Sequence, residues 1–187
     1  MASDHHGRIH IRKVGWLACL MAAAFCRPVG AQINWPYIPN NVQRPIGNSY
    51  GEYQNYGGAP YLHPGVDMLN DPYTPVYAVK SGWVKAVLTT AAELHWRVAI
   101  GDSAGPVPCN GWLYAHLDQP TIAVMPGDFV DEGDYLGSLV FWPIANFSHC
   151  HFVKIHDTGY PWPADWDFIA NPMDELQTIT DTTPPYF

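Results

Sequence analysis

Six short runs of β-branched and aromatic residues, separated by turn signals, occupy the middle of this 187-residue chain. Runs of this length, bounded by Gly, Asp and Ser, are typical of strands rather than helices. Only residues 91–94 and 172–176 have the character of a helical turn. The pattern predicts an all-β domain, mainly an antiparallel sheet or sandwich, with little helix. The predicted strands are Val76–Val79, Trp83–Leu88, Trp96–Ile100, Trp112–Leu117, Tyr135–Val140 and Cys150–Ile155.

The first 31 residues have the organisation of a secretory signal peptide. A basic stretch precedes an apolar run from Val14 to Phe25, and small residues lead up to Ala31. The run has about a dozen residues, whereas a membrane span needs roughly 20, which favours cleavage over an uncleaved anchor. We therefore expect an exported protein, periplasmic or extracellular, with no stable membrane insertion after cleavage.

Cleavage would remove four of the nine basic and one of the seventeen acidic residues and leave a formal net charge of −11. So acidic a chain is a poor partner for nucleic acid or an anionic membrane surface. We expect a monomer with an irregular N-terminal arm, because residues 32–60 are rich in Pro, Gly, Asn and Tyr and have no hydrophobic period. The predicted organisation is signal peptide 1–31, arm 32–60, functional domain 61–175, and tail or linker 176–187.

Two cysteines, Cys109 and Cys150, remain after the leader. An even number in an exported protein permits a disulfide. The bridge would close a loop of about 41 residues, and the chain-entropy model gives it about 4 kcal/mol. Strand alternation predicts that both side chains point away from the face that carries His149 and His151. Two buried free thiols are the alternative.

Four histidines and an aspartate fall into three short motifs, and these are the residue types that zinc prefers as ligands. Three protein ligands and an open position for water are typical of a catalytic zinc site. The two histidines of the last motif share one face of a predicted strand, about 6.6 Å apart. A Pro-Gly pair excludes a helix in the first motif and favours a bend there. The motifs are His63-Pro-Gly-Val-Asp67, Tyr114-Ala-His116-Leu117 and His149-Cys-His151.

With these motifs, residues 61–157 resemble the lysostaphin-type or LytM-like zinc endopeptidases, which cleave peptide bonds in bacterial cell walls and Gly-rich peptides. The resemblance implies a LytM-like peptidase core with one zinc ion per chain, bound by His63, Asp67 and His151. It implies that His116 and His149 are catalytic. Further motifs occur in the family's order: Thr74-Pro-Val-Tyr-Ala78, Ser81-Gly-Trp-Val84, Gly127-Asp-Phe-Val-Asp-Glu-Gly133 and Leu136-Gly137.

The loop before the last motif departs from the family pattern. Residues 141–148 read Phe-Trp-Pro-Ile-Ala-Asn-Phe-Ser, where the family usually has a Gly- and Thr-rich turn. We therefore expect a different peptide specificity, with Trp142 as the aromatic residue that contacts substrate.

The sequence favours a secreted zinc endopeptidase that hydrolyses peptide bonds in peptidoglycan cross-links or Gly-rich peptides. The alternative is a non-catalytic LytM-like module that binds and activates another cell-wall hydrolase, and a third interpretation is an exported zinc- or carbohydrate-binding β domain. Such regulatory modules typically lack one or more ligands, whereas this chain has every one. The arm is expected to be a surface strap, although its amide side chains also suit an inhibitory contact with the metal.

Overall fold

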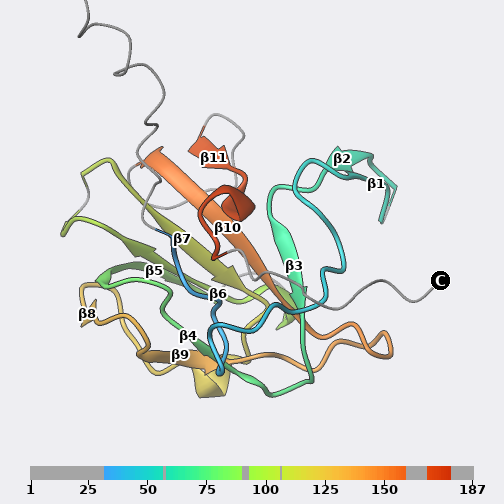
Figure 1. Ribbon diagram of the computed structural model, residues 1–187, viewed down its shortest axis with the longest axis horizontal. Coiled ribbons are helices and arrows are strands. Elements are labelled where there is room, and N and C mark those ends of the chain that lie inside the picture. Colours follow the sequence, from blue (N-terminus) through green and yellow to red (C-terminus); the bar gives the residue numbers. More distant parts are fainter. Residues whose placement is uncertain (1–31, 57, 90–92, 106, 159–167, 178–187) are drawn as a thin grey trace, which may run out of the picture. The chain divides into compact units, whose positions relative to one another are not determined.

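The computed structural model describes residues 32–56, 58–89, 93–105, 107–158 and 168–177 (Figure 1). These residues form β-strands, short 3-10 turns and loops, with no α-helix among them. The all-β prediction is confirmed. No helix in these ranges is long and apolar enough to cross a membrane. The predicted signal peptide and most of the predicted tail lie outside the described residues.

A seven-stranded antiparallel sheet forms the body of the domain. Its order is β11 (Ile169–Ala170), β10 (His149–Thr158), β7 (Cys109–Ala115), β6 (Arg97–Gly101), β5 (Gly82–Leu88) and β8 (Phe129–Val130), and β3 (Val66–Leu69) also pairs with β10. Two small sheets join β4 (Pro75–Tyr77) to β9 (Tyr135–Ser138) and β1 (Tyr53–Gln54) to β2 (Tyr61–Leu62). The 3-10 turns among the described residues are η1 (Glu93–His95), η2 (Gln119–Thr121) and η4 (Pro172–Asp174).

All six predicted strands occur, with ends that differ by up to three residues. The predicted turns at 91–94 and 172–176 correspond to η1 and η4 in their described parts. The strands that sequence patterns missed are β1, β2, β3, β8 and β11, each of two to four residues.

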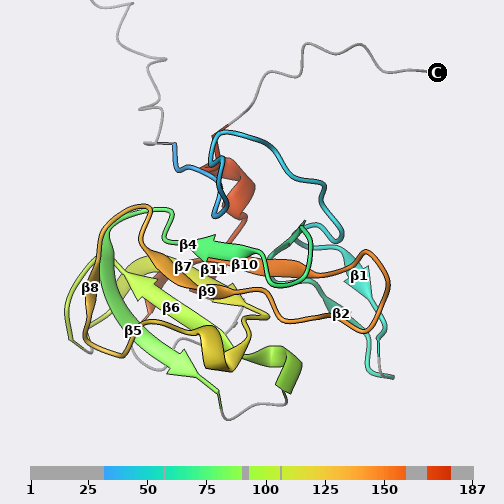
Figure 2. The same ribbon diagram turned by 90° about the horizontal axis from the view of Figure 1, so that it is seen from below.

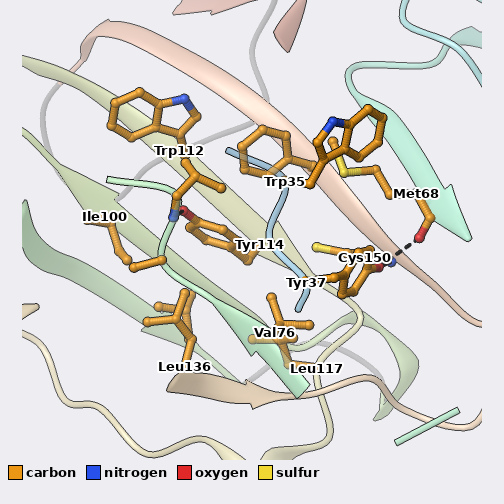
Figure 3. Close-up of a cluster of buried hydrophobic side chains, with 14 of the residues drawn as sticks. Trp35, Tyr37, Met68, Val76, Ile100, Trp112, Tyr114, Leu117, Leu136 and Cys150 are labelled. Atoms are coloured by element: carbon orange, nitrogen blue, oxygen red, sulfur yellow. Dashed lines mark hydrogen bonds between the residues drawn. The ribbon is translucent and has the colours of Figure 1, made fainter. Parts of the chain in front are cut away.

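Side chains of the central strands alternate between two buried clusters. Ile100, Tyr114 and Phe152 belong to the larger cluster, together with residues of β4 and β9 (Figures 2 and 3). Ala99 and Val153 belong to the smaller cluster on the opposite face. We call this second face the site face, because the candidate metal ligands also lie on it.

The N-terminal arm contributes directly to the larger cluster. Trp35 and Tyr37 are buried there, although the arm is largely irregular. The Tyr37 hydroxyl donates to the carbonyl of Met68 at 2.8 Å and accepts from the backbone N–H of Cys150 at 3.1 Å (Figure 3). One arm residue therefore joins β3 to β10 beneath the site.

Cys109 and Cys150 are free, buried thiols, so of the two alternatives the disulfide is wrong and the pair of buried thiols is confirmed. Cys109 pairs with Thr158, eight residues along β10 from Cys150, so the two lie roughly 26 Å apart along the strand. They also belong to different clusters. Cys150 points away from the site face as predicted, whereas Cys109 lies on that face, contrary to the prediction.

Candidate metal centre

Pairing of β3 with β10 brings two of the predicted zinc ligands together. Asp67 and His151 are direct cross-strand partners, so their side chains emerge side by side on the site face. His63 precedes β3 by three residues. Gly65, between His63 and Asp67, approaches β10 so closely that a Cβ there would lie 2.5 Å from the carbonyl oxygen of Phe152 and 3.0 Å from His151. A residue without a side chain is therefore required at this bend.

Three donor atoms converge at the end of β3. His63 Nε2 lies 2.9 Å from His151 Nδ1 and 3.1 Å from Asp67 Oδ1, and the last two atoms are 2.9 Å apart. A tetrahedral zinc site with bonds of 2.0–2.1 Å has donor atoms about 3.3 Å apart, so the triangle has nearly the size of one tetrahedral face. Of the described residues, these three form a cluster that can hold a metal ion. The donor set fits zinc.

Neighbouring groups orient the ligands. The Nδ1 of His63 donates to the carbonyl oxygen of Ser49 at 3.1 Å, which leaves Nε2 as the ring nitrogen that faces the other donors. The side-chain amide of Asn48 donates to Asp67 Oδ2 at 2.6 Å, on the side away from the histidines. Both supporting groups come from the N-terminal arm, and Asn48 contacts a ligand oxygen rather than the open side of the cluster.

Zinc binding at this cluster would displace the protons that the histidines share with Asp67. Burial opposes the charged form of Asp67, but hydrogen bonds from His151 and His63 outweigh burial and hold the pKa of Asp67 well below its usual range. Burial likewise opposes protonation of His63, but Asp67 outweighs it and raises the pKa of His63. Burial lowers the pKa of His151. Asp67 therefore supplies a carboxylate anion at neutral pH.

The two predicted catalytic histidines lie beside this cluster. His149 Nδ1 donates to the carbonyl of Phe147 at 2.7 Å, and His116 Nδ1 donates to the carbonyl of Leu94 at 2.5 Å. A carbonyl oxygen only accepts, so both Nε2 atoms carry lone pairs. His149 Nε2 is 3.6 Å from Asp67 Oδ1, and the rings of His116 and His149 are 4.5 Å apart.

Burial keeps both imidazoles neutral. It lowers the pKa of His149 and, with the nearby His149 and His151, lowers the pKa of His116 well below its usual value. Neutral imidazoles with a free Nε2 can accept protons at neutral pH.

His116 reaches the site through an unusual backbone conformation. Simple alternation would place it with Tyr114, on the opposite face from His149. Its φ is 66°, in the left-handed region that few residues other than glycine adopt. The alternation ends there, and the His116 ring turns toward His149. Strained backbone of this kind is frequent at functional sites.

The five residues border a cleft of about 720 Å³. Trp142 lines it and packs edge-on against His116 and His149, with ring centroids 4.7 and 4.8 Å away. His95 is exposed, and its ring centroid is 5.5 Å from that of His116 at the cleft rim. Residues at the cleft that sequence patterns missed include Gln54, Tyr56, Tyr61, His95 and Arg97.

Several solved structures share this arrangement of strands. Lysostaphin from Staphylococcus simulans matches with a TM-score of 0.60 and 22% identity over 83% of this chain and 60% of lysostaphin. The chain has the lysostaphin-type peptidase fold. Other structures with this fold are a chain of the SpoIIQ–SpoIIIAH pore-forming complex (TM-score 0.59, 17% identity, 78% of this chain and 91% of that one) and a putative M23 peptidase from Pseudomonas aeruginosa (TM-score 0.53, 19% identity, 79% and 51%). The resemblance found in the motifs is thus confirmed for the fold.

Sequence relatives occur in mycobacteria. No family model matches the chain. Uncharacterized proteins of Mycobacterium tuberculosis and Mycobacterium bovis are each 54% identical to it over 149 residues, covering 76% of this chain. The chain spans about a third of the length of these relatives, with 33% of each covered.

Proposed function

We propose that this chain is a secreted zinc-dependent endopeptidase that hydrolyses peptide bonds in peptidoglycan cross-links or Gly-rich peptides. The observation that carries the proposal is the convergence of three lone-pair donors from His63, Asp67 and His151 beside two neutral imidazoles in one open cleft. The lysostaphin-type fold is a second support. In this proposal the protein is exported, acts as a monomer and binds one zinc ion per chain.

The three proposed zinc ligands and the two catalytic histidines have different roles. Zinc bound by the three ligands would supply Lewis acidity, which polarises the scissile carbonyl and lowers the pKa of a water toward about 7. His149 Nε2 lies 3.6 Å from Asp67 Oδ1 of the donor cluster, so in this proposal it takes a proton from the attacking water.

The remaining steps of peptide-bond hydrolysis need no reactant other than water. The water oxygen bonds to the carbonyl carbon, the C–N bond breaks, and the proton held at His149 Nε2 passes to the leaving nitrogen. His116, anchored by the Leu94 carbonyl, is neutral and orients the attacking water by accepting a hydrogen bond at Nε2. The products are one carboxylic acid and one amine.

Zinc content and turnover test different parts of the proposal. We expect native mass spectrometry to find one zinc per chain, lost in Asp67→Ala. His149→Ala should keep the zinc but lose about 10²- to 10⁴-fold in kcat on peptidoglycan or Gly-rich peptides, the usual range for a general base. His156→Ala is the matched control, because His156 lies on β10 but does not line the cleft. Zinc-loaded protein that cleaves none of these substrates would contradict the proposal.

A binding module is the second candidate. The fold also occurs in a pore-forming complex, so it serves in assemblies too. A module that activates a separate cell-wall hydrolase should keep that activity in the His149→Ala variant. An endopeptidase should lose activity in the same variant.

A further inference from the structure

Arg97 shares a row with two of the proposed metal ligands. It pairs with Ala115, Ala115 pairs with His151, and His151 pairs with Asp67. Residues opposite one another in an antiparallel sheet lie on the same face. Arg97 therefore lies on the site face, two strands from His151.

Ala115, which lies between Arg97 and His151, leaves room for the arginine side chain. Ala115 has only a methyl group, and two strand spacings put the Cα atoms of Arg97 and His151 about 9.6 Å apart. Arg97 lines the same cleft as His63, His149 and His151. The guanidinium is thus a positive charge within the length of a short peptide from the proposed reacting centre.

Within the described residues this charge has no partner. Arg97 is the only lysine or arginine among the cleft residues, and Asp67, the only carboxylate there, faces the histidines. None of the ion pairs found between described residues includes Arg97. Its Nε is buried and has no hydrogen-bond partner among them. A partly buried guanidinium that lacks an anion is unfavourable, so an anion that enters the cleft gains from binding it.

We propose that Arg97 determines substrate specificity by binding a carboxylate of the peptide within about three residues of the scissile bond. The limit follows from the 9.6 Å separation and a rise of about 3.3 Å per residue in an extended peptide. The carboxylate comes from an acidic side chain or from a free C-terminus. The inference rests on the proposed endopeptidase function.

Matched peptides test this inference. Gly-rich peptides with Glu at one of the three positions on either side of a central Gly-Gly would be compared with the same peptides carrying Gln. A second pair would end in a free acid or an amide close to the central bond. For the zinc-loaded full chain we expect at least one acid peptide to have a kcat/KM about tenfold or more above its neutral partner, mainly through KM, as for a charge-assisted hydrogen bond. The pair that shows the preference identifies the source of the carboxylate.

Variants separate recognition from structure. Arg97→Gln should abolish the preference, so that the acid and neutral peptides of each pair have equal kcat/KM. Arg97→Lys should keep part of the preference, since it retains the charge but not the two-pronged geometry. Arg44→Gln is the control, because Arg44 lines a neighbouring hollow and not the cleft itself. No preference in the wild-type protein, or equal losses on both peptides at unchanged zinc content, would overturn the inference.

Measurements of peptide affinity test carboxylate recognition independently of turnover. Calorimetric titration of the same peptide pairs into zinc-loaded protein measures their affinities whether or not a bond is cut. Tighter binding of the acid peptide that depends on Arg97, without cleavage, would support carboxylate recognition and contradict the endopeptidase function. Equal affinity within every pair would overturn carboxylate recognition even if the peptides are cleaved.

Discussion

The side-chain amide of Asn48 donates to Oδ2 of Asp67 at 2.6 Å, while Oδ1 of the same carboxylate faces His63 and His151. Asn48 is buried and belongs to the N-terminal arm, so the arm orients one of the three proposed ligands. We expect Asn48→Ala to weaken zinc binding about 10- to 100-fold, the usual effect of removing a group that orients a ligand. Competition with a chromophoric chelator measures the affinity.

The control for this change is Asn41→Ala, because Asn41 is an exposed residue of the same arm. It should bind zinc as the wild-type protein does. Unchanged affinity in Asn48→Ala would show that the hydrogen bond to Asp67 does not contribute to metal binding.

Gly65 gives a second prediction, because its backbone contacts β10. In Gly65→Ala the new methyl group would lie 2.5 Å from the Phe152 carbonyl oxygen, too close for any real Cβ. The His63–Asp67 bend must move away from His151, so we expect about 1–3 kcal/mol lower stability, as for overpacked cores, together with loss of zinc. Urea unfolding and native mass spectrometry measure the two effects.

Gly137→Ala is the matched control, since a Cβ at Gly137 meets its nearest atoms at 3.5 Å, an ordinary contact distance. Full zinc occupancy in Gly65→Ala would mean that the bend tolerates the displacement.

Sequence patterns predicted the long strands and the clustering of the five site residues well. Strands β5 and β10 are seven and ten residues long and each contains several β-branched or aromatic residues, so local composition is sufficient to identify them. The two-residue strands β1, β8 and β11 carry too little local signal, because their pairing depends on partners distant in the sequence.

Two features of the site depend on geometry that patterns do not carry. Alternation assigns His116 to the wrong face, because nothing in the sequence marks its left-handed backbone. The same assumption of regular alternation up to His116 placed Cys109 on the wrong face. The position of Arg97 could have been predicted from the sequence. Val98 and Ile100 face the larger cluster, so alternation puts Arg97 on the site face. The support from Asn48 comes from an irregular segment and has no pattern.

Tyr37 gives a third prediction, on stability. Its hydroxyl satisfies both the Met68 carbonyl and the Cys150 N–H, and the side chain is fully buried. Tyr37→Phe leaves these two backbone groups without that partner, so we expect a loss of about 1–3 kcal/mol in the free energy of unfolding. Tyr53→Phe, at a tyrosine that is 66% exposed, should change stability by less than about 0.5 kcal/mol. Equal effects of the two substitutions in urea unfolding would argue against a role for the buried hydroxyl.

The buried imidazole of His116 predicts how the stability of the metal-free protein depends on pH. Burial holds the pKa of His116 well below 6.5, so below pH 6.5 the unfolded chain binds a proton at this position that the folded chain does not. Stability therefore falls as the pH drops from about 6.5 toward the folded-state pKa, by at most about 1.4 kcal/mol per pH unit for this one group. Removing the imidazole should make the fall shallower.

His116→Asn tests this expectation, because asparagine tolerates the left-handed backbone at this position. Urea unfolding of chelator-treated protein at pH 7.5 and 5.5 gives the loss of stability for each chain. The variant should lose less than the wild-type protein over this interval, whatever its absolute stability, because only the pH dependence reports the proton. His95→Asn controls for loss of an exposed imidazole at the same rim. Equal losses in wild type and His116→Asn would mean that His116 takes up its proton in the folded protein as readily as in the unfolded chain, and that its burial does not keep it neutral.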